Sequence, residues 1–589
     1  MSVNLVRGFL GLSFLFSVIF LSYKHYQVRD VPQCEDFGTE CLKFTIIHTN
    51  DNHGRFWHNK HKEYGMPARA TLIKSIRKEV EAQGNKVILL SGGDINTGVP
   101  ESDLQDAVPD FIGMNMMNYS AMAVGNHEFD NELSVLEMQR NLAKFPMLSA
   151  NIYKTIATED GEKLVRYFEP YKVFNAGKLR IAVIGLTTKD TAKLGNPQYI
   201  SGLTFTDPLV EIKKVIKQIK TNNEADLIMA VTHMGHFIIG KHGSNAPGDV
   251  SLARGLPKGD LQAIIGGHSQ NPVCVEPFSN RYSNFKAGKK CDPDIQNGTF
   301  IMQAHEWGKY VGRADFEYFN GKLHLAEYQL IPVNMTEFSS LGERKFVDDV
   351  IEADPELTAR LKPYQDKGQE KLDVHIAKIN GKLEGDRKVV RFQQTNLGHL
   401  IATAQKQAHA ADFAIMNSGG VRDSIDEGNV AYRDILTVQP FGNEVYKITM
   451  NGTDLTEYLG LVASNTIASG AYAQIIDVNM SVNCRTRKAK ISQINGMSFD
   501  KQGTYTFTIP GFNAAGGDGF PILTGTSNQF PDAKVIDNSG LTDEKVLYQF
   551  FKDKSDNNTK VIDVSEFEPL VGQIEYKHSR DVRGCKAGF

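Results

Sequence analysis

The stretch Gly125-Asn126-His127-Glu128-Phe129-Asp130 directly follows the short apolar run Ala121–Val124. A small apolar run that ends in glycine and then a polar cluster predicts a buried strand that delivers side chains into a cleft at its carboxyl end. Asn126 can offer a carbonyl oxygen to a metal, and His127 can hold or give a proton. Asp130 can fix the tautomer and orientation of His127. Taken alone, the stretch could equally be a strand-to-helix turn with Asn126 as a cap.

Four further predicted strands end in residues that can bind a metal, and they decide between these two interpretations. Any one such residue could be a buried histidine or a helix cap, but five strand ends doing so independently is improbable. The predicted strands and the residues after them are Phe44–His48 with Asp51 and His53, Val87–Leu90 with Asp94, Leu227–Val231 with His233, and Ala263–Ile265 with His268 and Gln270.

The predicted cluster contains imidazole, carboxylate and amide groups but no cysteine. Such mixed ligation suits Zn, Mn, Co or Fe. Two such ions roughly 3.5–4 Å apart lower the pKa of a shared water and hold the attacking and leaving oxygens of an in-line phosphoryl displacement. The sequence therefore predicts a two-metal site for phosphoryl chemistry, in which Asp94 could bridge the ions.

Apolar β-rich runs alternate with helical patterns from Lys43 to about Tyr328, which is typical of a layered α/β domain. The remaining predicted elements of this region are a strand at Ile181–Leu186, helices at Ala68–Val80 and Leu209–Ile219, and two strands of more antiparallel character at Thr299–Gln303 and Arg313–Tyr318.

The pattern changes around Asp354-Pro355, where the polar, charged and partly helical stretch Glu356–Glu370 is interpreted as an interdomain linker. A second folded unit starts near Leu372, with a helix at Leu397–Gln407 and a strand at Asp412–Met416. The predicted organisation is a leader over residues 1–33, a catalytic domain over residues 34–354, a linker over residues 355–371 and a C-terminal domain over residues 372–589.

Composition and the N-terminus bound the kind of protein. The chain has 589 residues and a formal net charge of −4, so the totals give no sign of the basic face that a nucleic acid polymer would need. Residues 9–23 are nearly all apolar. A run of about 15 residues fits the core of a secretory signal better than a membrane span, which needs roughly 20. No small-residue cleavage motif follows, so an uncleaved signal anchor is the alternative, and in both cases the remainder is exported.

Six cysteines agree with export into an oxidising compartment. Cys34 with Cys41 and Cys274 with Cys291 are plausible disulfides, and Cys484 and Cys585 remain as a third, long-range pair. Sequence alone leaves the connectivity open, and free buried thiols are the alternative.

Five motifs, in this order, resemble those of the calcineurin-like metallophosphoesterases and, within them, the 5′-nucleotidase family. They are DNH at 51–53, GGD at 92–94, GNHE at 125–128, THMGH at 232–236 and GGHSQ at 266–270. Longer stretches such as QAHEWGKYVGRADFE and QTNLGHLIATAQ extend the resemblance over about residues 43–577. It implies a four-layer αββα metallophosphoesterase domain joined by a helical linker to a second α/β (α+β) substrate-binding domain.

The resemblance also implies roles for the residues at the strand ends. The cofactors would be two divalent metal ions, Zn, Mn or Co, with metal-activated water as the nucleophile. His127 would stabilise the phosphoryl transition state or protonate the leaving oxygen, and Asp130 would orient it. One ion would be held by Asp51, His53, Asp94 and Gln270, and the other by Asp94, Asn126, His233 and His268.

The predicted C-terminal domain carries groups that a nucleotide needs. Arg387 and Arg391 lie four residues apart, so in an extended segment both would face the same way. Phe441 and Phe512 lie in glycine-containing loops, where two rings could stack a base. In the family the matching rings hold the base, with Asn443 near its edge and Asp518 near the ribose. By the resemblance, the substrate-binding residues are Arg387, Arg391, Asn417, Gly420, Arg422, Phe441, Asn443, Phe512 and Asp518.

The expected protein is thus an exported, periplasmic and monomeric hydrolase of 5′-nucleotides and, by the resemblance, of nucleotide sugars such as UDP-glucose. Its C-terminal domain would be the nucleotide-binding one. Two enzymatic alternatives are a 2′,3′-cyclic-nucleotide phosphodiesterase with 3′-nucleotidase activity and an apyrase-like nucleotidase. A non-enzymatic alternative is a surface nucleotide-binding protein with an inactive metal site.

Overall fold

The computed structural model describes residues 34–586, apart from residues 159–160, 197–198, 239–245, 276–284, 340–342, 525–527 and 538–539. The apolar run at residues 9–23, predicted to be a signal or an anchor, lies outside the described residues. Within the described part of the chain, no helix is both long and apolar enough to cross a membrane.

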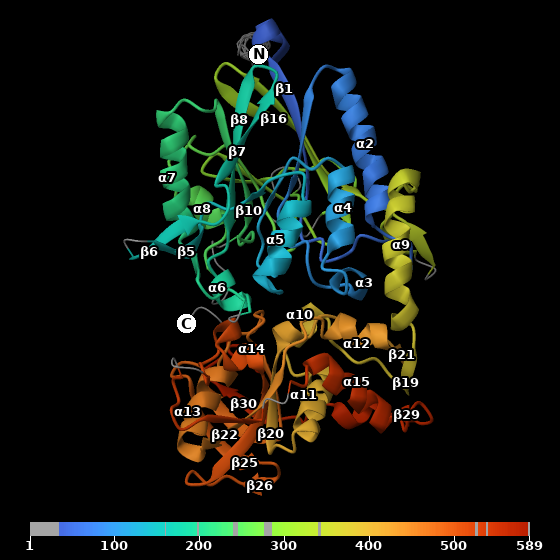
Figure 1. Cartoon of the computed structure of the whole chain (residues 1–589), viewed down its shortest axis with the longest axis vertical. Helices are drawn as coiled ribbons and strands as arrows, with labels where there is room; N and C mark the ends of the chain where they lie inside the picture. Colours follow the sequence, from blue (N-terminus) through green and yellow to red (C-terminus); the bar gives the residue numbers. More distant parts are fainter. Residues whose placement is uncertain are drawn as a thin grey trace, which may run out of the picture.

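The N-terminal domain contains two sheets that pack face to face between two layers of helices (Figure 1). The core between the sheets contains Ile46 from one sheet and Val183 from the other. Ile47, the next residue in its strand, points to the opposite face and packs with Ile73 of the outer helix α2 (Met66–Ala82). A second outer core joins the other sheet to Ile216 of α7 (Pro208–Thr221). The four-layer αββα arrangement is therefore confirmed.

The bounds of the N-terminal strands follow their order in each sheet. The six-stranded sheet runs β16 (Lys322–Pro332), β15 (Tyr310–Phe319), β1 (Leu42–Thr49), β2 (Lys86–Ser91), β3 (Ala121–Ala123) and β4 (Met147–Leu148). The seven-stranded sheet runs β12 (Pro272–Val273), β14 (Thr299–Ala304), β11 (Ala263–Ile265), β10 (Leu227–His233), β8 (Leu179–Thr187) and β7 (Tyr171–Ala176), with β13 (Asp294–Gln296) beside β14.

The other elements of this domain are short or lie outside the two sheets. They are η1 (Cys34–Glu40), α3 (Pro100–Asp103), α4 (Val108–Met116), η2 (His127–Phe129), α5 (Leu133–Leu142), α6 (Thr191–Leu194) and α8 (Asp249–Arg254), a small sheet of β5 (Ile152–Thr158), β6 (Gly161–Arg166) and β9 (Leu203–Phe205), and a pair of β17 (Thr336–Phe338) and β18 (Arg344–Phe346).

All the predicted strands and helices of this domain are present, and the register of the strands explains where the site lies. β1 and β2 pair in parallel with Thr49 opposite Ser91, and β10 pairs in parallel with both β8 and β11. Their carboxyl ends therefore open on the same side of the sheets. The prediction that Thr299–Gln303 is antiparallel is wrong in part. β14 lies inside the sheet, where it pairs in parallel with β11 on one edge and antiparallel with β12 and β13 on the other.

Helix α9 (Pro355–Leu372) connects the two domains as one continuous helix, where the sequence predicted a partly helical stretch. The Asp354 carboxylate accepts a hydrogen bond from the Leu357 amide at 2.9 Å and caps the first turn. Leu357 and Leu361 are buried in the outer core of the N-terminal domain. One face of α9 is therefore part of that domain.

The C-terminal domain is also built from mixed sheets and helices, and its two main cores lie on either side of β20 (Phe413–Asn417). The predicted helix is α11 (Asn396–Ala408), and the predicted strand is β20. The strands are β23 (Ala473–Ile476), β20, β27 (Thr504–Pro510), β22 (Val445–Asn451) and β28 (Lys534–Asp537) in one sheet, β26 (Met497–Ser498), β25 (Lys488–Ile494), β24 (Val478–Asn483) and β30 (Ile574–Lys577) in a second, and β21 (Gly428–Ala431), β19 (His375–Ile379) and β29 (Val561–Ile562) in a third.

Short helices of the C-terminal domain face the N-terminal domain (Figure 1). Among them, α10 (Arg387–Val390) corrects a prediction: Arg387 and Arg391 lie on a helical turn with its cap, where the sequence predicted an extended segment. The Asp386 side chain caps this turn by accepting from the Lys388 amide. The remaining described helices of the C-terminal domain, whatever their orientation, are η4 (Ser418–Gly420), α12 (Tyr432–Val438), α13 (Gly452–Ala463), α14 (Gly511–Ala514), η5 (Gly517–Gly519), α15 (Asp543–Lys554) and η7 (Val564–Phe567).

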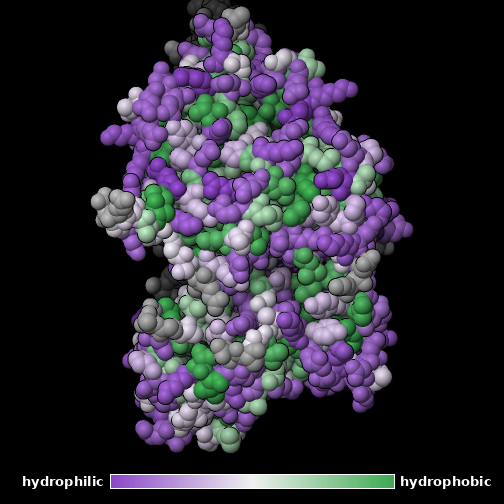
Figure 2. Space-filling model, in the orientation of Figure 1, coloured by the Kyte–Doolittle hydropathy of each residue, from purple (hydrophilic) through white to green (hydrophobic). Residues whose placement is uncertain are grey.

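The cysteines form three disulfides, Cys34–Cys41, Cys274–Cys291 and Cys484–Cys585, which are the pairings that the sequence made plausible but left open. The surface seen in Figure 2 is mostly hydrophilic over both domains, and hydrophobic residues are scattered among the hydrophilic ones. The molecule narrows in this view between the two domains.

Candidate active site

The loops after the parallel strands bring the predicted ligands together under backbone constraint. Asp51, His53 and Asp94 all have positive φ, at 50°, 50° and 55°. Residues other than glycine adopt this region only where the surroundings hold them there. Two backbone hydrogen bonds do so: the Asp51 amide donates to the Gly93 carbonyl at 2.9 Å, and the His53 amide donates to the Asp94 carbonyl at 3.1 Å. The first two strand-end loops therefore form one unit.

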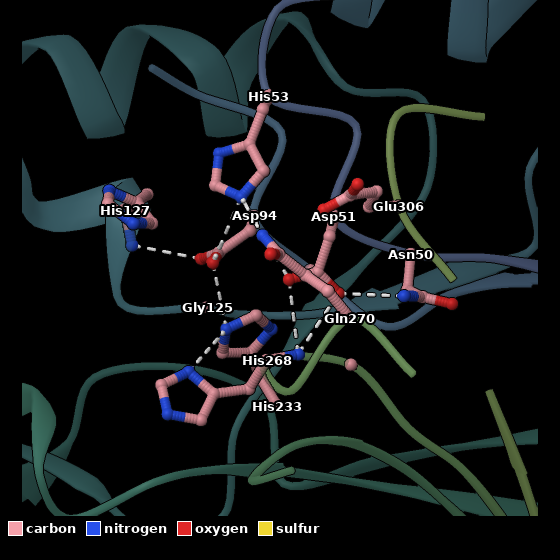
Figure 3. A network of polar contacts seen from close by, with 12 residues as sticks. Asn50, Asp51, His53, Asp94, Gly125, His127, His233, His268, Gln270 and Glu306 are labelled. Atoms are coloured by element: carbon pink, nitrogen blue, oxygen red, sulfur yellow. Dashed lines mark hydrogen bonds and ion pairs between the residues drawn. The ribbon is translucent and has the colours of Figure 1, made fainter. Parts of the chain in front are cut away.

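The first group of predicted ligands surrounds His53 (Figure 3). Its Nε2 atom lies 3.9 Å from Asp51 Oδ1 and 3.9 Å from Asp94 Oδ2. The side-chain nitrogen Nε2 of Gln270 lies 3.0 Å from the same imidazole nitrogen. Asp51, His53 and Asp94 are fully buried, so their polar atoms face one another rather than bulk solvent.

The second group lies on the other side of Asp94 (Figure 3). His233 Nε2 is 2.9 Å from Asp94 Oδ2 and 3.1 Å from Asn126 Oδ1. His268 Nδ1 is 2.9 Å from Asn126 Oδ1 and 3.2 Å from His233 Nε2. Asp94 therefore reaches both groups, as a ligand shared by two ions would have to do.

The imidazole tautomers fit a metal. A backbone carbonyl can only accept, so His53 Nδ1–H must donate to the Thr97 carbonyl at 2.8 Å, and His233 Nδ1–H to the Gly92 carbonyl at 2.7 Å. In the neutral rings the lone pairs on Nε2 then point into the cluster, which is how a histidine ligand is oriented. Gln270 fits only after its amide rotates, because its Oε1 atom accepts a hydrogen bond from Arg387 and its Nε2 atom faces the cluster.

The electrostatics of the cluster also suit a cation. Burial and the neighbouring carboxylate of Asp94 outweigh the attraction of His233 and raise the pKa of Asp51 to about 7. Burial alone would lower the pKa of His233, but Asp94 and Asp51 raise it to about 10. Two buried carboxylates thus draw positive charge to this place, and a divalent cation would supply it.

Two residues that sequence reasoning left without a role hold this cluster in place. The Glu128 carboxylate accepts from the Gly125 amide at 2.6 Å, from the Ile95 amide at 2.8 Å and from the Asp94 amide at 3.1 Å. Asn50 donates to Asp51 Oδ2 at 2.7 Å. Glu128 lies within the GNHE motif and Asn50 beside the DNH motif, so position next to predicted ligands was the available signal.

His127 and Asp130 form the predicted pair at the edge of the cluster. His127 Nδ1–H donates to Asp130 Oδ2 at 2.6 Å, and the His127 amide donates to Asp94 Oδ1 at 2.9 Å. Burial tends to lower the pKa of His127, but the carboxylates of Asp130 and Asp94 outweigh it and raise that pKa above its usual value. The His127 ring stacks on Phe441 of the C-terminal domain, with ring centroids 6.0 Å apart.

Three arginines of the C-terminal domain face the cluster across the domain boundary. The guanidinium of Arg422 lies 5.5 Å from the centre of the Phe441 ring. Burial and the nearby Arg387 lower the pKa of Arg422 to about 10, and burial lowers that of Arg391 as well. Arg391 Nε has no hydrogen-bond partner among the described residues. Arg391 and Arg422 are half-buried and Arg387 is exposed, and all three line one cavity. Three like charges with an open donor fit an anionic ligand.

One cavity of about 1340 Å³ joins these groups. Asp51 and His233 do not line it and lie behind the other ligands. Asn417 Nδ2 donates to Asp518 Oδ2 at 2.6 Å, which fixes that carboxylate at the wall. The predicted residues on the wall are His53, Asp94, Asn126, His127, Asp130, His268, Gln270, Arg387, Arg391, Asn417, Gly420, Arg422, Phe441, Asn443, Phe512 and Asp518.

The two-sheet fold and the cluster at its strand ends define a metallophosphoesterase. Residues 44–272 match the calcineurin-like phosphoesterase family, whose members use divalent metals, and residues 375–525 match the C-terminal domain of 5′-nucleotidases. The chain belongs to the 5′-nucleotidase family.

Relatives of similar length support this assignment. The chain is 54% identical over 540 residues to the 5′-nucleotidase of Vibrio cholerae, covering 91% of this chain and 94% of the relative. It is 49% identical over 539 residues to Protein UshA of Escherichia coli, with 91% and 94% covered. The solved structure of the 5′-nucleotidase precursor from Thermus thermophilus has the same fold, with a TM-score of 0.69 at 24% identity over 91% of this chain and 100% of that one.

Proposed function

We propose that this protein hydrolyses 5′-nucleotides to nucleoside and phosphate, and UDP-sugars to UMP and sugar 1-phosphate. The observation that carries this proposal is one cavity that joins a cluster of buried metal-competent side chains to three arginines, with His127 between them. Relatives at 54% and 49% identity that are named 5′-nucleotidase and UshA support the same reaction.

Two divalent ions are proposed as cofactors, with Zn, Mn and Co as the candidates. When bound, they activate a water molecule and neutralise charge on the phosphoryl group. The chain holds the imidazoles in the correct tautomer through the carbonyls of Thr97 and Gly92. The proposed ligand sets are Asp51, His53, Asp94 and Gln270 for one ion and Asp94, Asn126, His233 and His268 for the other.

His127 is proposed to act on the leaving oxygen. Because its Nδ1–H donates to Asp130, its Nε2 atom is the one available to the substrate. A raised pKa keeps a proton on Nε2 at higher pH than an ordinary histidine would. The proton can therefore be given to the oxygen that leaves with the nucleoside.

The C-terminal domain is proposed to present the nucleotide to this centre. Arg387, Arg391 and Arg422 would hold non-bridging phosphate oxygens, which matches their shared place on the cavity and their mutual repulsion. Phe441 and Phe512 would hold the base by stacking, with Asn443 at its edge. Asp518, fixed by Asn417 and lining the same cavity, would accept from ribose hydroxyls, and Gly420 would let the backbone approach.

Residues 34–354 and 372–589 are proposed to act as two bodies joined by residues 355–371, and turnover would need one to rotate on the other. Rotation would break cross-domain contacts such as Arg433 with Glu101 and Arg387 with Gln270. An engineered disulfide that locks the linker should therefore slow turnover, and unchanged turnover would contradict the idea.

Export to the periplasm and a monomeric state complete the proposal. Three disulfides and no free cysteine among the described residues suit an oxidising compartment. Size-exclusion chromatography with light scattering should give the mass of one chain.

Product release from 5′-AMP, ATP, UDP-glucose and a 2′,3′-cyclic nucleotide tests the function. Phosphate is measured for the first two, glucose 1-phosphate for UDP-glucose, and the nucleoside monophosphate for the cyclic nucleotide. Wild type and His127→Ala should be compared after chelation and after adding back Mn, Co or Zn. We expect metal-dependent release from 5′-AMP and UDP-glucose that falls about 10²–10⁴-fold in the variant. Dominant activity on ATP or on the cyclic nucleotide would favour the apyrase-like or phosphodiesterase alternative. No release from any of the four would favour a nucleotide-binding protein.

A further inference from the structure

A polar wall of the cavity, on the Asp51–His53 side of the ligand cluster, has no part in the proposed mechanism. It consists of Arg55, His305, Glu306, Trp307 and Lys309 of the N-terminal domain, and Asp423 of the C-terminal domain lines the same cavity. Four of these residues lie in the QAHEWGKYVG stretch, which sequence reasoning used only for the family resemblance.

Two cations of this wall are fixed on one indole ring. The Arg55 guanidinium carbon lies 3.9 Å from the centre of the Trp307 ring, and Lys309 Nζ lies 4.1 Å from it. Arg55 Nη1 also donates to the His53 carbonyl at 2.7 Å. Trp307 therefore positions two donors by cation–π contacts, and it serves as a support rather than as a stacking surface for a ligand.

Acceptors lie beside these donors. Glu306 Oε1 accepts from Lys309 Nζ at 2.8 Å. His305 Nδ1 is buried and has no hydrogen-bond partner among the described residues. A wall that mixes guanidinium, ammonium, carboxylate and imidazole groups suits a neutral ligand with many hydroxyl groups, because each hydroxyl both donates and accepts.

The wall and the base-binding loops flank the ligand cluster at different places. Phe441 stacks on His127 with ring centroids 6.0 Å apart. The Trp307 amide instead donates to the Asp51 carbonyl at 2.7 Å, and Arg55 contacts His53. A substrate whose nucleoside lies at Phe441 therefore meets this wall only with a group attached beyond its terminal phosphorus.

The chemistry of nucleotide sugars supplies such a group. With 5′-AMP, the nucleoside in the C-terminal domain is the leaving side. If the nucleoside of UDP-glucose occupies the same place, the oxygen of water bonds to the sugar-bearing phosphorus. The bond from that phosphorus to the bridging oxygen breaks, and the bridging oxygen leaves with its electron pair as part of UMP. The protons of the water end on the two product phosphates or in solvent, and the sugar stays on the phosphorus at the metal centre.

We propose that this wall is a sugar subsite, in which Arg55 and Glu306 bind hydroxyl groups of the hexose carried by the attacked phosphorus. The proposal rests on the function proposed above and names the part of the cavity that would distinguish a nucleotide sugar from a plain nucleotide. UDP and UDP-glucose form a substrate pair with the same nucleoside and two phosphates, and the hexosyl group of UDP-glucose replaces one ionisable oxygen on the terminal phosphate of UDP.

The test compares kcat/KM for UDP-glucose and UDP in wild type, Arg55→Gln and Glu306→Gln. We expect the ratio of the two values to fall about tenfold to 100-fold in each variant, as loss of a hydrogen bond to a charged group implies. Lys193→Gln is the control, since it removes a cation from the same cavity outside this wall and should leave the ratio unchanged. Hydrolysis in ¹⁸O-water should place the label in glucose 1-phosphate.

Two kinds of result would contradict the proposed sugar subsite. An unchanged ratio in both variants, or a label found in UMP, would overturn the subsite while leaving the proposed hydrolase activity intact. A wild type that hydrolyses UDP but not UDP-glucose would overturn the nucleotide-sugar activity and the subsite together. Hydrolysis of UDP by each variant shows that the protein is folded, so a loss of UDP-glucose hydrolysis alone cannot be ascribed to unfolding.

Discussion

Replacing Asp130 with asparagine should change the pH dependence of catalysis more than any other property. The Asp130 and His127 side chains are only 8% and 13% exposed, and their 2.6 Å contact is therefore little screened by solvent. A hydrogen bond to a charged group contributes about 1.5–3 kcal/mol. At about 1.4 kcal/mol per pKa unit, Asp130→Asn should lower the pKa of His127 by about one to two units.

The sign follows from the role of His127 as a proton donor. Activity should persist while His127 is protonated and fall as the pH rises through its pKa, which Asp130 and Asp94 raise above 6.5. In Asp130→Asn the alkaline limb of kcat/KM for 5′-AMP should move to lower pH. Above neutral pH the variant should be about 10-fold to 100-fold slower, and the difference should narrow on the acid side.

The assay is a pH profile of kcat/KM at saturating metal for wild type, Asp130→Asn and Glu132→Gln. Glu132 is an exposed carboxylate two residues away, so its variant should follow the wild-type curve. An alkaline limb at the same pH in Asp130→Asn and in wild type would refute the assignment. A loss that is equal at every pH would show that Asp130 acts by geometry alone.

Four further changes test metal binding, base stacking and the disulfides. Glu128→Gln should weaken metal affinity about 10-fold to 100-fold in a chelator competition, because Glu128 accepts from three amides of the ligand loops. Phe512→Ala should raise KM for 5′-AMP about fivefold to 100-fold with kcat within about twofold, since base stacking contributes about 1–3 kcal/mol. Removing Cys484–Cys585, which closes a separation of 101 residues, should lower the free energy of unfolding by about 5 kcal/mol in denaturant titration. Removing Cys34–Cys41, with a separation of 7, should lower it by only about 2 kcal/mol.

The parts of the fold that depend on periodicity could be predicted from the sequence. Apolar runs such as Ile181–Leu186 marked buried strands, and the spacing in Leu209–Ile219 marked an amphipathic helix, because burial on one face or both dictates those patterns. The convergence of polar residues at strand ends was also predictable, since parallel strands open on one side.

What depends on contacts between distant segments could not be predicted. The left-handed backbone at Asp51 and His53 is held by Gly93 and Asp94, which lie on another strand-end loop. The turn at Arg387 is short, and a side-chain cap rather than an apolar pattern defines it. The contact of Arg55 with Trp307 joins residues about 250 positions apart, and the sequence around each residue does not indicate it.

The most direct test of the account is the metal content of the purified chain, measured by mass spectrometry of the elements alongside the rate of 5′-AMP hydrolysis during stepwise chelation. We expect close to two divalent ions per active chain, and a rate that falls with metal content and returns when metal is restored. Full activity in protein that retains no divalent metal would contradict it.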